Sequence, residues 1–161
     1  MAKKKVQKTN AARILDRLGI DYELLTYPVD ENDLSANHVA EVTGIPPERI
    51  YKTLVVRGDR TGVFMAVIPG AGELDLKAAA AASGNKRAEM VHLKEVFELT
   101  GYVRGGCSPL GAKKSYPVYC DDSMMQQEHI CVSAGRRGEQ ISLPPADLIR
   151  AAEAQTAHLA R

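Results

Sequence analysis

Residues 50–68 restrict the possible folds of this chain more than any other segment. Residues 50–57 are rich in β-branched and other apolar side chains, and residues 63–68 are almost continuously apolar. Between them, Gly58-Asp59-Arg60-Thr61-Gly62 reads as a compact turn. The pattern predicts two strands joined by a hairpin, the second of them central in a sheet. Because such a connection is too short for a parallel crossover, the sheet must contain an antiparallel pair.

Helical patterns alternate with short strands over the rest of the chain. Apolar residues from Ala11 to Leu18 recur at helical spacing, with Thr9 or Asn10 as the cap and Gly19 at the end. The other predicted helices cover residues 35–43, 76–83, 93–99 and a C-terminal stretch from 143 to about 157. Asp75 is the predicted cap of the helix at residues 76–83. The other predicted strands cover residues 21–27, 86–90, 117–120, 130–133 and 140–142. Residues 101–114 are glycine-rich and predict a loop with a little strand. We therefore expect an α/β fold with a mixed sheet and helices packed on it.

The length and charge of the chain limit the classes of protein to which it can belong. A chain of 161 residues fits one domain, which we expect to span residues 9–161 behind a flexible basic segment, residues 1–8. No apolar stretch is long enough to cross a bilayer, and no signal peptide is evident. The formal net charge of +1 argues against a DNA-coating protein. An odd number of cysteines suggests reduced thiols, so we expect a cytoplasmic protein that binds neither DNA nor membrane.

The cysteines and histidines do not form a recognisable metal or nucleophile motif. Cys107, Cys120 and Cys131 contain no C-x-x-C pair, and His129-x-Cys131 is one close pair rather than a ligand set. A G-x-S-x-G elbow is also missing from the sequence. We expect no metal, no cofactor and buried structural thiols, with Cys107 as the one cysteine that its loop could expose.

Three segments have chemistry that also permits ordinary structural interpretations. The glycines between Gly105 and Gly111 let backbone N–H groups approach a ligand, or simply build a tight turn. Lys52 enters an apolar strand and either extends to solvent at the strand end or projects into a pocket. The turn at residues 133–138 holds two arginines that suit phosphate, or that are solvated hairpin charges.

Taken together and in this order, the three segments resemble the YbaK/EbsC family, free-standing relatives of the prolyl-tRNA synthetase editing domain. The resembling segments are Tyr51-Lys52-Thr53-Leu54-Val55, Gly105-Gly106-Cys107-Ser108-Pro109-Leu110-Gly111 with Lys113-Lys114, and Val132-Ser133-Ala134-Gly135-Arg136-Arg137-Gly138. Tyr27, Gly44, residues 69–76 and Gly101-Tyr102 match as well, so the resemblance covers about residues 9–159. It implies one α/β domain of the synthetase-associated type, with a mixed, barrel-like sheet surrounded by helices and a cleft for the 3′ end of an aminoacyl-tRNA.

The resemblance also implies a role for individual residues. Lys52 matches the essential lysine of the family. The substrate-binding residues carried over are Tyr27, Gly105, Gly106, Ser108, Pro109, Leu110, Gly111, Ser133, Gly135 and Gln140, and the candidates for tRNA phosphate contacts are Lys113, Lys114, Arg136 and Arg137. Gln140 is a departure, because the family often has an acidic residue there, and Ser35-Ala36 replaces an aromatic residue of some members.

The activity implied is removal of cysteine from Cys-tRNA(Pro), and loosely from Cys-tRNA(Cys), as a lyase-type reaction. In a YbaK-like mechanism the thiol of the substrate attacks its own ester and leaves as a thiolactone, which explains why no protein nucleophile is needed. Association with prolyl-tRNA synthetase is a further family expectation. Two alternatives stay open: a water-dependent deacylase of alanyl- or another misacylated tRNA, and a non-catalytic module that binds tRNA or a synthetase.

Overall fold

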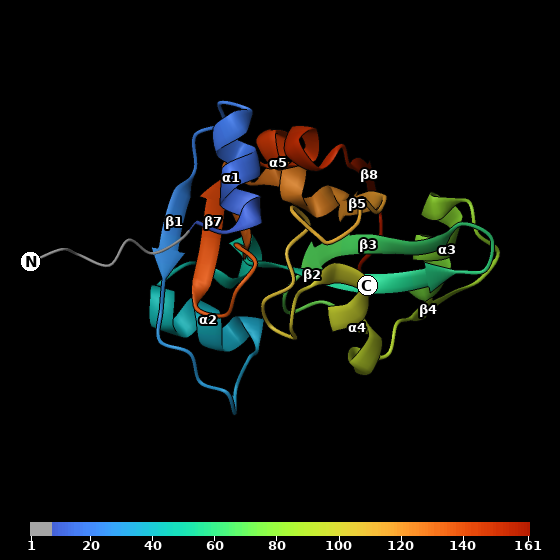
Figure 1. The fold of residues 1–161 in the computed structure, drawn as a ribbon, viewed down its shortest axis with the longest axis horizontal. Coiled ribbons are helices and arrows are strands. Elements are labelled where there is room, and N and C mark those ends of the chain that lie inside the picture. The colour runs from blue at the N-terminus through green and yellow to red at the C-terminus, as the bar shows by residue number, and fades with distance from the viewer. Residues whose placement is uncertain (1–7) are drawn as a thin grey trace, which may run out of the picture.

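Two β-sheets with helices packed on them make up the fold, in a computed structural model that describes residues 8–161 (Figure 1). Residues 1–7, which hold most of the expected flexible basic segment, lie outside the described residues. Lys8 is described, and its ammonium forms an ion pair of 2.6 Å with the carboxylate of Asp16.

The larger sheet has the strand order β4-β2-β3-β5-β8. Strands β2 (Tyr51–Gly58) and β3 (Gly62–Pro69) form the predicted antiparallel hairpin, and β3 is the central strand, as expected. On the far side of β3, strands β5 (Val118–Asp121) and β8 (Gln155–Ala157) add in parallel, while β4 (Ala88–Met90) pairs antiparallel with β2. The sheet is therefore mixed, as the short connections predict.

The smaller sheet has the order β1-β7-β6 and is antiparallel throughout. It consists of β1 (Glu23–Thr26), β7 (Glu139–Leu143) and β6 (Ile130–Ser133). A single parallel bridge, Ile50 with Cys131, joins it to the start of β2. The expectation of a barrel-like sheet is wrong, because one bridging residue pair between β2 and β6 does not continue into a ladder that could close a barrel.

Three of the helices begin at side-chain caps, as the sequence predicts at Thr9 and Asp75. The Thr9 hydroxyl accepts from the main chain of α1 (Asn10–Arg17), Ser35 does so for α2 (Ala36–Thr43), and Asp75 for α3 (Leu76–Ser83). The remaining helices are α4 (Leu93–Thr100) and α5 (Pro145–Ala152), with 3₁₀ turns η1 (Pro47–Arg49) and η2 (Asp122–Gln126). No strand forms between residues 101 and 114 of the described chain, so the expected short strand there is wrong.

The predicted C-terminal helix is too long. Helix α5 ends at Ala152, and Glu153 takes a left-handed conformation with φ of 51°. Residues 155–157 then pair with the edge of β5 as strand β8. Helix propensity in this alanine-containing stretch is overridden by pairing with a strand that lies far away in the sequence.

Apolar side chains from both sheets fill the interior. One core cluster includes Leu15 of α1, Met65 of β3 and Ile141 of β7, and so connects the two sheets. A second cluster lies on the other face of the larger sheet, where Phe64 and Ile68 pack with Ala79 of α3. No helix among residues 8–161 has the length and apolar character that a bilayer span requires.

Candidate active site

A cleft of about 560 Å³ opens where the two sheets separate beyond the bridge between Ile50 and Cys131. One wall is the exposed edge of β2, and the opposite wall comes from β6 and β7 through Ser133 and Gln140. The segment of residues 27–36 contributes further lining, as do Arg104, Gly105 and Cys107 at the start of the glycine-rich loop. The cleft thus collects residues from distant parts of the chain.

The edge of β2 is free along the cleft because its neighbours pair with it only at the two ends. Ile50 bridges to Cys131, and the Val55 carbonyl accepts from the Val91 N–H at 3.1 Å. In an antiparallel strand, successive residues point their main-chain groups to alternate sides. Since the Val55 carbonyl points toward β4, the N–H and carbonyl of Thr53 point the same way, into the cleft.

Lys52 lies on this edge and lines the cleft, half-buried. Among residues 8–161, nothing lies within hydrogen-bond or ion-pair distance of its ammonium. Burial lowers the pKa of Lys52 because desolvation penalises the charged form, and the Glu73 carboxylate offsets part of this effect. A cation without a partner beside a cleft is available to a ligand that carries or develops negative charge.

Two polar atoms in the cleft walls are buried without a hydrogen-bond partner in the described chain: Thr53 Oγ1 and Gln140 Oε1. Gln140 is 5% exposed, and both residues line the cleft. A buried acceptor left unpaired costs about 1–3 kcal/mol. A hydrogen-bond donor from a ligand or an ordered water would complete groups of this kind.

The glycine-rich loop packs firmly against the turn between β6 and β7. A Cβ on Gly106 would lie 3.2 Å from the Arg137 nitrogen and 3.3 Å from the Arg136 carbonyl carbon, so a side chain there would require the two backbones to move apart by a few tenths of an ångström. The Arg137 Nε donates to the Arg104 carbonyl at 2.7 Å. Two of the segments singled out in the sequence therefore form one unit of the cleft wall.

Tyr102 holds the inner part of this unit in place. Its hydroxyl donates to the Leu110 carbonyl at 2.6 Å, and the Ser108 hydroxyl accepts from the Leu110 N–H. Gly111 and Gly135, both with positive φ, pack against the Tyr102 side chain. Ser108 is completely buried. Tyr102 and Ser108 therefore hold the glycine-rich loop in place from the interior of the protein.

The predicted site residues therefore fall into two groups. The cleft is lined by Tyr27, Lys52, Gly105, Ser133, Arg137 and Gln140. Within the described chain, the cleft lining does not include Gly106, Ser108, Pro109, Leu110, Gly111, Lys113, Lys114, Gly135 and Arg136. Of the cations in the second group, Lys113 and Lys114 are exposed, and Arg136 forms an ion pair of 3.3 Å with Glu139.

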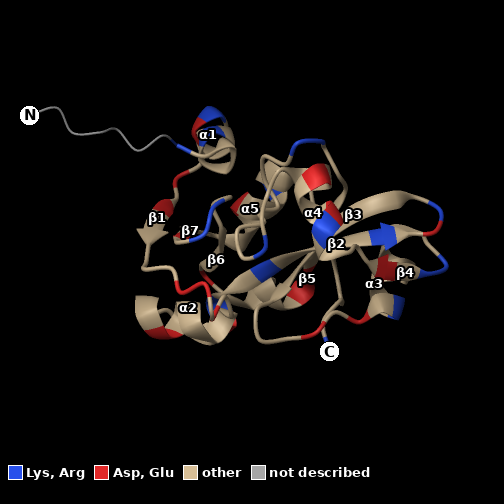
Figure 2. Ribbon diagram, turned by 60° about the horizontal axis from the view of Figure 1, so that its bottom comes forward, with Lys and Arg blue, Asp and Glu red and all other residues tan. Residues whose placement is uncertain are grey.

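Charges of both signs surround the cleft. Arg104 and Arg137 line it together with Asp30 and Asp33. Figure 2 shows basic and acidic segments interspersed over the ribbon rather than a continuous basic stripe. The surface is thus suited to a few phosphate contacts near the cleft.

The thiols lack the character of a nucleophile. Burial raises the pKa of Cys107 to about 12, and it raises that of Cys120 to about 12 as well. Cys107 lines the cleft, yet it stays a neutral thiol at physiological pH. Cys120 and Cys131 are buried in the core clusters, as expected.

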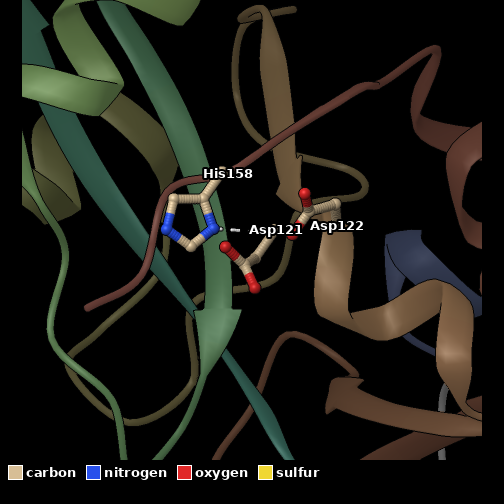
Figure 3. A group of neighbouring side chains, drawn as sticks. All are labelled: Asp121, Asp122 and His158. Carbon is tan, nitrogen blue, oxygen red and sulfur yellow. Dashed lines mark ion pairs between the residues drawn. The ribbon is translucent and has the colours of Figure 1, made fainter.

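Within residues 8–161, one group of side chains has metal-ligand chemistry: Asp121, Asp122 and His158, whose candidate ligand atoms lie within 4.8 Å of one another (Figure 3). The Asp121 carboxylate is already occupied. One oxygen accepts from the Leu159 and Ala160 N–H groups at 2.8 and 2.9 Å, and the other accepts from the main chain and hydroxyl of Ser123. This group fixes the chain after β8 to β5 and lies outside the cleft lining.

Several cleft residues were not predicted from the sequence. Thr53 is one: strand alternation directs its side chain to the face opposite that of Lys52, yet both residues line the cleft. Arg104, Met90 and Leu93 also line the cleft. The last two reach it because β4 pairs with β2, which no local pattern reveals.

Comparisons with known proteins agree on one family. A sequence profile described as "Aminoacyl-tRNA editing domain" matches residues 30–151. A protein of Enterococcus faecalis (strain ATCC 700802 / V583), named "Putative Cys-tRNA(Pro)/Cys-tRNA(Cys) deacylase EbsC", is 49% identical over 160 residues, which are 99% of this chain and 98% of that protein. The "Multifunctional Ser/Thr-tRNA deacylase ProXp-y" of Escherichia coli (strain K12) is 26% identical, covering 100% of this chain and 97% of that one.

A solved structure has the same fold. It is titled as that of "a putative trans-editing enzyme for prolyl tRNA synthetase" and superposes with a TM-score of 0.82 at 25% identity. The match covers 96% of this chain and 99% of that chain.

Proposed function

We propose the function of this chain from one premise: it belongs to the family of aminoacyl-tRNA editing domains. On that basis it is a trans-editing deacylase that removes cysteine from mischarged Cys-tRNA(Pro), and from Cys-tRNA(Cys) to a lesser degree. The 49% identity to EbsC over nearly the whole of both chains supports this substrate, which the name of EbsC states. We place the reaction in the cytoplasm, where tRNA is aminoacylated.

The observation that carries the proposal is the cleft with an unpaired Lys52 on one wall and unpaired buried acceptors around it. An aminoacyl ester complements this arrangement. Its ammonium brings three donors for Gln140 Oε1, Thr53 Oγ1 and the Thr53 carbonyl. Its carbonyl then lies toward Lys52, whose positive charge stabilises the negative charge that develops on the oxygen.

The reaction that fits these residues uses the thiol of the substrate. The cysteinyl sulfur attacks the carbonyl carbon of its own ester, a C–S bond forms and the C–O bond to the terminal ribose breaks. The ribose oxygen receives the proton that the thiol loses, and a thiolactone leaves. This is a lyase-type elimination in which the protein supplies orientation and charge stabilisation. Cys107, a neutral and partly buried thiol, takes no part.

The remaining assignments concern binding. Tyr27, Ser133 and the main chain at Gly105 contact the aminoacyl group, and the packed residues from Gly106 to Gly111 with Gly135 hold these contacts in place. Exposed Lys113 and Lys114, with Arg137 and Arg136, contact phosphates of the acceptor end. Prolyl-tRNA synthetase is the proposed protein partner that supplies specificity for its tRNA.

A second candidate is a water-dependent deacylase for amino acids that lack a thiol. ProXp-y, related over the whole chain, favours it, because serine and threonine have no sulfur nucleophile. In that case water attacks the same carbonyl and free amino acid leaves.

The test is deacylation of tRNA(Pro) carrying cysteine, S-methylcysteine, alanine or serine, with mass analysis of the product. We expect release from cysteine alone, first as thiolactone, and loss of this activity in Lys52→Ala. Lys77→Ala, an exposed lysine of α3 outside the cleft lining, is the matched control. Release of S-methylcysteine, alanine or serine would establish the water-dependent reaction instead. No release from any substrate would leave a binding module.

A further inference from the structure

Helix α4 and the end of β4 expose large apolar side chains beside the cleft. Leu93 is 62% exposed, Phe97 60% and Met90 42%. Leu93 and Phe97 are four residues apart on one helix and therefore lie on the same face. Single exposed apolar residues are ordinary, but a group of this kind usually marks an interaction surface. We call these three residues the apolar mouth.

The apolar mouth is continuous with the cleft. Met90 and Leu93 also line the cleft, together with Val96 of the same helix. Helix α4 is anchored without Phe97, since the Tyr116 hydroxyl donates to the Leu99 carbonyl at 2.7 Å and Arg57 of β2 pairs with Glu95 at 2.7 Å. The exposed face is therefore not needed to hold the helix in place.

We propose that the apolar mouth is a stacking surface for the unpaired bases at the 3′ end of the tRNA, with Phe97 as its aromatic member. This inference rests on the proposed function. The ester bond joins the amino acid to the terminal ribose, so an ester held at Lys52 brings the terminal base to the opening of the same cleft. Aromatic side chains stack on bases without regard to sequence.

The charges on α4 favour bases over phosphates as the group bound there. Lys94 is exposed and is followed on α4 by Glu95, which is paired with Arg57 at 2.7 Å, and by the exposed Glu98. This mixture offers no cluster of cations for a phosphate backbone. An apolar face with one aromatic ring suits the flat face of a base instead.

Binding of an acceptor-stem oligonucleotide with 2-aminopurine in place of the terminal adenine tests the proposal. Stacking quenches the fluorescence of 2-aminopurine, and no aminoacyl group or turnover is required. We expect quenching by the wild type and binding weakened roughly 5- to 150-fold in Phe97→Ala, the range for loss of one stacked base. Phe97→Tyr should bind as the wild type does. Met125→Ala, which removes a 51% exposed side chain outside the cleft lining, is the matched control.

Kinetics separate this proposal from the proposed function. Phe97→Ala should raise KM for cysteinyl-tRNA while kcat stays within about twofold, and it should leave turnover of cysteine ethyl ester, which has no base, unchanged. Oligonucleotide binding that is equal in Phe97→Ala and the wild type would overturn the stacking surface, even if deacylation is normal. Loss of synthetase binding alone in this variant would also overturn it and assign the face to a protein partner.

Discussion

At the scale of single residues, the cleft contains polar groups that lower the stability of the free protein and that the proposed function uses to bind substrate. Gln140 Oε1 and Thr53 Oγ1 are buried without partners in the described chain, which destabilises the free protein. An arrangement of this kind is retained when a ligand completes it. Gln140 stands where the resemblance implies an acidic residue, and its amide oxygen can accept a hydrogen bond from an ammonium without adding a charge to the cleft.

Gln140→Leu should separate these two effects. The free energy of unfolding should stay unchanged or rise by about 1 kcal/mol, because a buried acceptor without a partner is removed. The value of kcat/KM for cysteinyl-tRNA should fall about tenfold, since the substrate ammonium loses an acceptor. Urea unfolding and steady-state deacylation measure the two quantities. A parallel loss of stability and activity would show that Gln140 is structural.

The pH dependence of deacylation should reflect Lys52. Its pKa is lowered from 10.5 by burial, and the proposed role requires the protonated form. Enzyme-dependent turnover, corrected for spontaneous ester hydrolysis, should therefore decline as pH rises through a pKa below 10.5. Glu73→Gln removes a charge that raises this pKa and should shift the decline to still lower pH. Glu128→Gln, at an exposed site outside the cleft lining, should not. If the pH profile of Glu73→Gln were identical to that of Glu128→Gln, the decline could not be assigned to Lys52.

At the scale of helices and strands, local signals predicted the elements well and their partners poorly. Caps at Thr9 and Asp75 and the turn at residues 58–62 are local interactions, so the sequence identifies them. Strand β8 depends on pairing with β5, and the cleft depends on the bridge between Ile50 and Cys131. Both join residues far apart in sequence. The site residues were predicted by resemblance to a family, whereas Thr53 and the lining from β4 and α4 required the fold.

Asp121→Asn should test how the chain after β8 is fixed. Burial alone would raise the pKa of Asp121, but hydrogen bonds from Ser123, Leu159 and Ala160 lower it below 3.8. A pKa lowered in the folded state means that the stabilisation is complete above about pH 4 and is lost as pH falls through the folded pKa. We expect the free energy of unfolding of Asp121→Asn to be about 2 kcal/mol lower than that of the wild type at pH 7, and this difference should become smaller below pH 4. Urea unfolding of both proteins at pH 7 and below pH 4 measures this difference. The same difference in stability at both pH values would contradict the role of the Asp121 charge.

At the scale of the whole molecule, near-neutral charge determines how a large polyanion is bound. A formal net charge of +1, with acidic and basic groups interspersed, gives little long-range attraction for tRNA. Affinity must come from a few local contacts and from the cleft itself.

The salt dependence of tRNA binding should show how many phosphate contacts the protein makes. The apparent affinity for tRNA should fall with rising salt, and Lys113→Ala should reduce the slope of log K against log salt by about 0.7–0.9, the value for one phosphate contact. Lys77→Ala makes the same change of charge on α3 and should leave the slope unchanged. Equal slopes for all three proteins would remove Lys113 from the interface. Titration of unacylated tRNA between low and moderate salt is sufficient.

The division of the cleft between two sheets has a consequence for how such proteins diversify. Lys52 belongs to the larger sheet, whereas Ser133 and Gln140 belong to the smaller one, and a single bridge joins them at this point. Substitutions in the wall that contacts the amino acid can therefore accumulate without disturbing the strand that holds the lysine. We expect relatives to retain the lysine of the larger sheet while residues of the smaller sheet vary. A change of substrate would then require substitutions in one wall of the cleft only.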